Sequence, residues 1–268
     1  MLKIGLVSYL NTAPLVWGLN KQKTAWGIYE AHPSELNRLL SQGELDMALV
    51  SSFEYAAHAE NYLLLPDISI SATGRVGSVL LFSRLPLEKL SHQEIVLTRA
   101  SATSVALLKL LLEDFCGLKP LYRPGTYEES RDASAYLAIG DEALILRTKN
   151  NFLECHDLAA LWMEHTRLPF VFAVLAVRKE AWEQKKDTIK AFARELYLSR
   201  AKGTAALGDI AKACRNLTSL GINECLVYLK GIEYDLSGLK QEALRVFFRH
   251  LVRRGEIPKL PELKFVEL

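Results

Sequence analysis

Short apolar runs alternate with helix-like segments along the first two-thirds of the chain. Runs that we interpret as buried strands cover residues 4–7, 25–31, 45–50, 62–65, 68–70, 79–82, 94–97, 119–122, 135–139 and 170–177. Most are followed by polar residues and then by apolar positions at helical spacing, as after Ser104. This alternation predicts an α/β protein. Residues 170–177 lack polar alternation, so we expect a central strand that is covered on both faces.

The last third of the chain has helical periodicity. We expect helices over residues 182–200, 204–214, 223–228 and 239–254. The last of these has a basic polar face, which is typical of a solvated helix and also compatible with a nucleic-acid patch. We favour the solvated face, and therefore expect no nucleic-acid partner. The apolar face would pack on its own lobe or on a second copy, so a monomer and a homodimer both remain open.

Length and composition are those of a soluble globular protein. The 268 residues are 50% hydrophobic and 24% charged, with a formal net charge of +2, and they suffice for one large domain or two ordinary ones. No run is long enough to span a membrane, and the first strand begins without a signal-peptide core. The four cysteines lack the spacing of zinc or redox motifs. We therefore expect reduced thiols, no membrane association and a cytoplasmic location.

Polar side chains follow several of the predicted strands where a helix is expected to begin. Ser8 and Asn11 come between the first strand and Pro14, which suits the first turn of a helix. In open α/β sheets ligands lie at this carboxyl edge, and helix N-termini favour anions. A single junction is explained equally well by a capped turn without a ligand. The arrangement recurs at residues 51–52 and 98–104, which favours a shared binding site.

These junctions predict a crevice for a small, polyoxygenated anion that is held mainly by neutral donors. Its candidate hydroxyl and amide residues are Ser8, Asn11, Ser51, Ser52, Ser78, Ser83, Thr98, Ser101, Thr103 and Ser104. Gly140 would let backbone approach a ligand closely. Arg75 is a candidate anion partner or a surface turn residue. Asp141 is included as a site residue, although a helix cap is the commoner role for aspartate at such a position.

Several familiar catalytic motifs are absent from the sequence. It contains no phosphate-binding loop of the Gly-x-x-x-x-Gly-Lys type, no Gly-x-Ser-x-Gly and no His-Glu-x-x-His. The six histidines fall in polar breaks or on helix faces, which is typical of surface histidines. We therefore predict neither a metal site nor a Ser-His-Asp triad. The residue pattern alone indicates binding rather than catalysis.

Seven segments that follow one another along the chain form a pattern: residues 8–15, 33–37, 51–55, 77–83, 98–104, 139–144 and 168–173. Together they resemble the chorismate dehydratase family of the futalosine route to menaquinone. They cover most of residues 1–180, whereas the helical last third matches loosely. His156 departs from the tyrosine of the family pattern. The resemblance implies a two-lobed α/β fold like the type II periplasmic binding proteins, with the ligand cleft between lobes and a helical C-terminal part. It implies one lobe of residues 1–87 plus 179–268, and another of residues 88–178.

The resemblance also implies a reaction. Chorismate would lose water to give 3-[(1-carboxyvinyl)oxy]benzoate, catalysed by a hydro-lyase without a cofactor, with the substrate's own enolpyruvyl carboxylate as base. Asn11 and Ser8 would position the substrate and its leaving hydroxyl. One carboxylate would be held at the junction of residues 98–104, with Ser78 and Ser83 contributing from the hinge side.

Two alternative functions remain open at this level. One is the related lyase that makes 1,4-dihydroxy-6-naphthoate, whose family uses a histidine base. The motifs Ser-Tyr-Leu-Asn at 8–11 and Ser-Ser-Phe-Glu-Tyr at 51–55 favour the dehydratase. The other is a cytoplasmic protein that binds an aromatic acid without converting it. Sequence does not distinguish this sensor from an enzyme, because the same residues would serve both.

Overall fold

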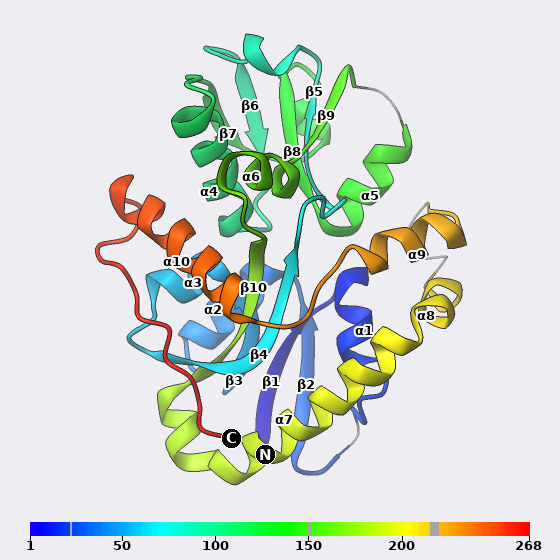
Figure 1. Ribbon diagram of the computed structural model, residues 1–268, viewed down its shortest axis with the longest axis vertical. Helices are drawn as coiled ribbons and strands as arrows, with labels where there is room; N and C mark the ends of the chain where they lie inside the picture. The colour runs from blue at the N-terminus through cyan, green and yellow to red at the C-terminus, as the bar shows by residue number, and fades with distance from the viewer. Residues whose placement is uncertain (22, 150–151, 215–219) are drawn as a thin grey trace.

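Two five-stranded sheets form the centres of two lobes, which are stacked along the long axis of the molecule (Figure 1). The computed structural model describes residues 1–21, 23–149, 152–214 and 220–268. The sheet orders are β2-β1-β3-β10-β4 and β7-β6-β8-β5-β9. Because helices connect and cover both sheets, the protein has the α/β architecture that the sequence predicts.

In the first sheet a parallel half is joined to an antiparallel half. Its strands are β1 Leu2–Val7, β2 Trp26–Ala31, β3 Met47–Ser51, β4 Tyr62–Ala72 and β10 Phe170–Arg178. β1 pairs in parallel with β2 and β3, and β10 lies antiparallel between β3 and β4. The helical segments here are a 3₁₀ turn Leu10–Thr12, α1 Ala13–Val16, α2 Pro33–Ser41 and α3 Ser52–Ala57. The central position predicted for residues 170–177 is confirmed.

The second sheet contains β5 Val79–Ser83, β6 Glu94–Leu97, β7 Leu121–Pro124, β8 Ala135–Ile139 and β9 Glu154–Asp157. Its helical segments are 3₁₀ turns at Leu87–Lys89 and Glu128–Ser130, α4 Ala102–Lys109, a π-helical turn Leu110–Phe115, α5 Gly140–Lys149 and α6 Leu158–Thr166. β9 was not among the strands that we expected from the sequence; it begins at Glu154 and pairs with β5. Residues 150 and 151 lie outside the described part of the chain.

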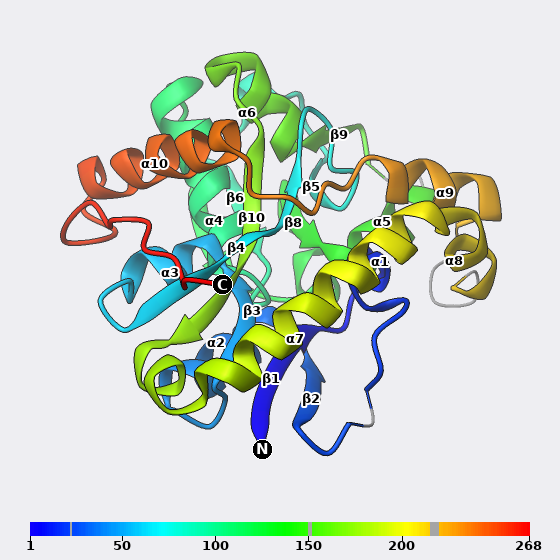
Figure 2. The same cartoon turned by 60° about the horizontal axis from the view of Figure 1, so that its bottom comes forward.

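The C-terminal part is helical, as predicted. It comprises α7 Lys179–Ala205, α8 Leu207–Ala213, α9 Ile222–Lys230 and α10 Gly238–Arg253. α7 runs diagonally across the first lobe (Figure 2) and contacts α1, β1 and β4, whereas α10 packs against β10 and α3. Within the described ranges, no helix combines the length and apolarity needed to cross a membrane.

Sheet membership corrects the expected lobe boundaries. β5 belongs to the second sheet although it precedes residue 88, and β10 belongs to the first although it precedes residue 179. The chain therefore crosses between lobes at residues 73–78, and it returns between α6 and β10 (Figure 1). The expected boundary between residues 87 and 88 instead falls within a 3₁₀ turn, which Pro86 precedes, between two strands of the second sheet. A turn within a lobe and a crossover between lobes have the same Pro-rich and polar signature.

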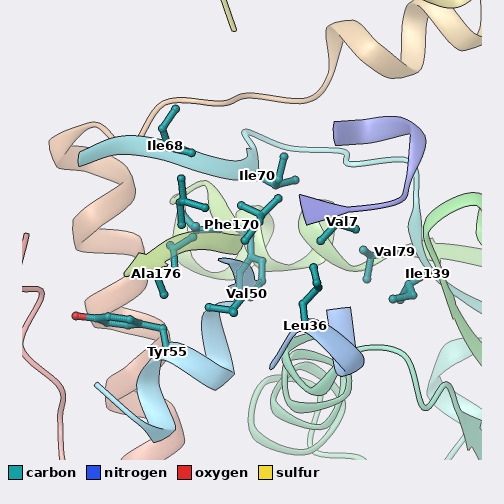
Figure 3. Close-up of a cluster of buried hydrophobic side chains, with 14 of the residues drawn as sticks. Val7, Leu36, Val50, Tyr55, Ile68, Ile70, Val79, Ile139, Phe170 and Ala176 are labelled. Atoms are coloured by element: carbon teal, nitrogen blue, oxygen red, sulfur yellow. The ribbon is translucent and has the colours of Figure 1, made fainter. Parts of the chain in front are cut away.

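One continuous apolar core joins the two lobes beneath the cleft. Val7 at the end of β1 lies near Val79 and Ile139 of the second sheet (Figure 3), and all three are less than 9% exposed. Val79 and Ile139 are also direct partners in the β5–β8 ladder. Burial of an aliphatic side chain of this size stabilises the fold by about 1.5–3 kcal/mol. The carboxyl ends of β1 and β8 therefore meet at the base of the cleft.

One local prediction was wrong. We expected separate strands over residues 62–65 and 68–70, but β4 is continuous through Pro66, with a register irregularity and a left-handed residue at Asp67.

The start of α2 is set by a proline. The helix begins at Pro33, and His32 is the cap residue. Proline at the first helical position explains this start, because its missing N–H needs no partner there.

Candidate functional site

A small cavity of about 60 Å³ lies between the lobes at the base of the cleft. It brings together five of the predicted site residues, which come from distant parts of the sequence: Asn11, Ser78, Ser101, Ser104 and Gly140. The other lining residues are Val7, Tyr9, Thr12, Ile70, Val76, Val79, Ile139, Phe172 and Ala173. The cavity therefore has an apolar wall and a few hydrogen-bonding groups, as small-molecule sites commonly do.

Asn11 lines this cavity and is held on two sides. Its backbone carbonyl accepts a hydrogen bond from the Tyr234 hydroxyl at 2.9 Å, and its Oδ1 accepts one from the Thr12 hydroxyl at 3.2 Å. Within the described part of the chain, no hydrogen bond is made by the Asn11 NH₂ group. The amide is thus fixed through its oxygen and its backbone, and its two donor hydrogens remain for a ligand.

Ser101 and Ser104 occupy the N-terminus of α4. Ser101 caps the helix: its Oγ accepts hydrogen bonds from the Ser104 backbone N–H at 3.2 Å and from the Ser104 hydroxyl at 3.1 Å. Because this oxygen already accepts two bonds, the Ser101 hydroxyl proton is left to donate toward the cavity. The positive end of the helix dipole adds to this donor and favours a bound carboxylate.

Ser78 is fixed from the C-terminal part of the chain. The Tyr228 hydroxyl donates to Ser78 Oγ at 3.0 Å, and the Ser78 carbonyl accepts from the Gly140 N–H at 2.8 Å. Burial raises the pKa of the Tyr228 phenol well above its usual value, so the group stays protonated. Since Ser78 Oγ accepts from tyrosine, its own proton is available to a ligand.

The loop that carries Asn11 is also docked on the second lobe. The Leu10 N–H donates to Asp141 Oδ1 at 3.2 Å, and a Cβ added at Gly140 would lie 3.0 Å from the Tyr9 ring. Asp141 stands in the first turn of α5. The helix-cap interpretation is therefore wrong: this carboxylate accepts from the Asn11 loop instead. Burial is the largest influence on Asp141 and raises its pKa.

An outer groove of about 420 Å³ lies beside the cavity, and Tyr9 and Ile139 line both. Three predicted site residues line this groove: Ser8, Thr98 and Asp141. Ser8 is exposed, whereas Thr98 Oγ1 accepts a hydrogen bond from the Ala100 N–H at 3.2 Å. Ser8 and Thr98 therefore lie next to the cavity and do not line the cavity itself.

Three predicted site hydroxyls are committed to the framework. Ser51 caps α3 by accepting from the Glu54 N–H at 3.2 Å, and the Ser52 hydroxyl donates to the Val171 carbonyl at 2.6 Å. Thr103 Oγ1 accepts from the Phe53 N–H at 2.8 Å, which joins the N-termini of α3 and α4 across the lobes. These residues do not line the cavity, because each hydroxyl is used to position a helix.

Two more predicted site residues lie away from the cavity. Ser83 stands at the end of β5 opposite to Ser78, and its hydroxyl bonds to the backbone of Leu85. Ser83 therefore does not contribute from the hinge side. Arg75 is exposed and lines a different pocket. Both residues flank a short strand, and sequence alone did not show which end or face of that strand meets the cleft.

Sequence reasoning missed the residues that hold the site from outside. Tyr228 and Tyr234 are 5% and 4% exposed and belong to the C-terminal part of the chain. Tyr228 falls in a predicted helix and Tyr234 between two predicted helices, where both look like ordinary core tyrosines. Only the folded structure shows that their hydroxyls reach Ser78 and Asn11. Phe172, within the predicted strand at 170–177, likewise contributes a cavity wall.

Charged side chains stay outside the inner cavity. No lysine, arginine or histidine is among the described residues that line it. Nor does the described part of the chain bring three His, Cys, Asp or Glu side chains together in a group that could hold a metal ion. The arrangement can grip an anion through neutral donors and one helix N-terminus, and it contains no evident protein base.

Two α/β lobes with a cavity between them are the fold of the periplasmic binding proteins. A protein of Archaeoglobus fulgidus superposes with a TM-score of 0.72 at 17% identity, covering 95% of this chain and 98% of the other. The periplasmic aliphatic sulphonate binding protein SsuA from Escherichia coli gives 0.68 at 12% identity, covering 98% and 95%. These likenesses show the fold, which is the fold that the sequence resemblance implied.

The chain belongs to the menaquinone biosynthesis family, whose model matches residues 2–253. It is 37% identical over 263 residues to a chorismate dehydratase from Thermus thermophilus, covering 91% of this chain and 93% of that protein. The family predicted from the sequence is thereby confirmed. The match also extends through most of the helical last third, where the sequence motifs were weakest.

Proposed function

We propose that this protein eliminates water from chorismate to give 3-[(1-carboxyvinyl)oxy]benzoate. The observation that carries the proposal is the NH₂ group of Asn11, which makes no hydrogen bond to any described residue and belongs to a cavity lined by serine hydroxyls, in a chain 37% identical to a chorismate dehydratase. The reaction would take place in the cytoplasm, without a cofactor. It is a carbon–oxygen lyase reaction that is driven by aromatisation of the ring.

The donors suit the charge that this elimination develops. A proton leaves ring C3, the C4–O bond breaks, and the hydroxyl departs as water after taking up a proton. As the C3–H bond breaks, negative charge spreads toward the ring carboxylate. The Ser101 hydroxyl and the N-terminus of α4 would hold that carboxylate and so stabilise the transition state.

We assign the leaving hydroxyl to Asn11. Its NH₂ group is the donor that the loop leaves without a bond among the described residues, and its oxygen is held by Thr12. Ser78, oriented by Tyr228, would bind the second carboxylate from the hinge side. Because no described histidine or lysine lines the cavity, the enolpyruvyl carboxylate of the substrate itself is the proposed base.

The cavity has to widen to accept this substrate. A volume of about 60 Å³ accommodates only a few water molecules, whereas chorismate carries a ring and two carboxylate-bearing groups. The outer groove provides the approach, and the crossings at residues 73–78 and between α6 and β10 provide a hinge. Ser8 and Thr98 would meet the substrate as it enters.

Incubation of metal-stripped protein with chorismate tests the proposal. We expect turnover to a product that has lost one water. Chromatography and mass spectrometry measure its formation. Asn11→Ala should lower kcat much more than it raises KM, because its contact develops with the leaving group. Binding without turnover would instead support a sensor of aromatic acids. If the protein neither binds nor converts chorismate, the naphthoate-forming lyase becomes the leading alternative. The substrate of that lyase would then be assayed next.

A further inference from the structure

A second and larger pocket lies on the other side of the hinge segment. Its volume is about 680 Å³, and its walls come from residues 75–77, β9, α6 and α9. Of its lining residues only Val76 also lines the catalytic cavity. The Tyr228–Ser78 hydrogen bond stands between the two spaces. The pocket is therefore a separate site, and it is built from elements of both lobes.

Two arginines in this pocket lack ionic partners within the described chain. Arg75 and Arg147 are both exposed, and neither forms a salt bridge there; Arg147 has only a 3.5 Å contact with the Gly77 carbonyl. Both arginines line the pocket together with Cys155 of β9. Burial raises the pKa of the Cys155 thiol, and the positive charges of Arg147 and Arg75 act against that rise. The pocket therefore holds two guanidinium groups that form no salt bridge with any described carboxylate.

Most of the acidic groups in the pocket are already engaged. Asp157 accepts from the Gly77 N–H at 2.6 Å and caps α6, and Glu224 accepts from the Gly221 N–H at 2.9 Å. Glu164 is exposed. The engaged carboxylates hold the hinge and the start of α9, so they compete little with a ligand for the arginines.

Apolar side chains line part of the pocket beside polar ones. Leu80, Leu161 and Val227 are among them, and Val227 is 72% exposed. The polar side chains include His156, which contacts Glu154 at 2.8 Å, and Asn223. Guanidinium groups bind carboxylates through paired hydrogen bonds, and an apolar wall suits a flat hydrocarbon ring. We propose that this pocket is a second binding site for a small aromatic carboxylate, with Arg75 and Arg147 as its anion partners. The site does not depend on the proposed reaction.

Calorimetric titration with benzoate tests this site. Wild-type protein should bind benzoate. A double variant that carries both Arg75→Gln and Arg147→Gln should bind it about tenfold more weakly or worse, because charge-assisted hydrogen bonds to the carboxylate are lost. Both side chains are exposed, so the variant should fold normally. Benzamide, which has the ring without the charge, should bind wild type at least about tenfold more weakly.

Two control variants separate this pocket from other places where benzoate could bind. Arg194→Gln removes an exposed arginine on α7, and Asn11→Ala alters the catalytic cavity; both should keep wild-type affinity. The proposal is overturned if wild type binds no benzoate, if the double arginine variant binds as tightly as wild type, or if Asn11→Ala abolishes binding. The last result would place benzoate in the catalytic cavity.

Discussion

The backbone N–H of Leu10 in the first lobe donates to the carboxylate of Asp141 in the second, at 3.2 Å. Leu10 directly precedes Asn11. The backbone carbonyl of Asn11 accepts a hydrogen bond from the hydroxyl of Tyr234, in the C-terminal part of the chain. The loop that carries Asn11 is therefore positioned jointly by the two lobes and the C-terminal segment. We expect a change in the relative position of the lobes to move the Asn11 amide as well.

Removal of the Asp141 carboxylate should disturb that placement. In Asp141→Ala the Leu10 N–H loses its acceptor, and we expect kcat to fall by about tenfold, the value of one well-formed hydrogen bond to a charged group. KM should change less, because the cavity donors remain. Steady-state kinetics measure both values. Asp132→Ala, which removes an exposed carboxylate from the same lobe, is the matched control; an equal fall in both variants would refute a positioning role.

The same carboxylate should make stability depend on pH. Burial raises the pKa of Asp141 above its ordinary value of 3.8, and the bonds and charges around it offset only part of this effect. A raised folded-state pKa means that the folded protein holds this proton more tightly than the unfolded chain. The stabilisation is therefore full below about pH 3.8 and is lost as pH rises through the folded-state pKa.

Asp141→Asn cannot ionise and should avoid that loss. Its free energy of unfolding relative to wild type should increase as pH rises from about 4 to neutrality. Urea unfolding of both proteins over this range measures the difference. If the difference in free energy of unfolding stays constant with pH, ionisation of Asp141 does not destabilise the folded protein.

Tyr234 should act on catalysis through the backbone of Asn11. Tyr234→Phe leaves the Asn11 carbonyl without this donor, at a cost of about 1 kcal/mol of stability, and should also lower kcat. Tyr197→Phe is a close control, because the Tyr197 hydroxyl likewise donates to a backbone carbonyl, that of Pro66, away from the cavity. We expect similar losses of stability but full activity in the control. Equal activity of the two variants would leave Tyr234 with a purely structural role.

Much of the fold could be read from local patterns. Strands such as β8 and β10 are apolar runs with clear ends, and the N-termini of α3 and α4 carry serine caps at the predicted junctions. Periodicity does not specify which sheet a strand joins. β5 therefore was assigned to the wrong lobe, although its bounds were nearly right. Its alternate residues pack into two different cores, a fact that depends on the whole second lobe.

From the sequence, the site could be predicted only as a set of junctions where a strand ends and a helix begins. A hydroxyl that faces a ligand and one that caps or crosslinks helices have the same sequence signature. Ser101 lines the cavity and also caps α4, whereas Thr103 accepts a hydrogen bond from the Phe53 N–H of the opposite lobe. The distinction depends on side-chain direction at the lobe interface. Tyr228 and Tyr234, whose hydroxyls bond to Ser78 and Asn11, could not be predicted as site residues for a related reason. Each lies more than 140 residues away from its partner in the sequence.

Gly140 should tolerate no side chain, because it combines a left-handed backbone with close contact to Tyr9. Its φ is +59°, and an added Cβ would lie 3.0 Å from the Tyr9 ring. Gly117 is a control with a similar φ of +68° and open space around the added Cβ. Alanine at either position costs about 1 kcal/mol or more of backbone strain.

Only Gly140→Ala should also push Tyr9 away from α5 and shift the loop that carries Asn11. We therefore expect both variants to lose stability in urea unfolding, whereas turnover falls in Gly140→Ala alone. Full activity of Gly140→Ala would show that the loop does not need its contact with the second lobe. Loss of activity in both variants would point to backbone strain rather than to Tyr9 as the cause. The pair thus separates the conformational requirement of glycine from its role in seating the catalytic loop.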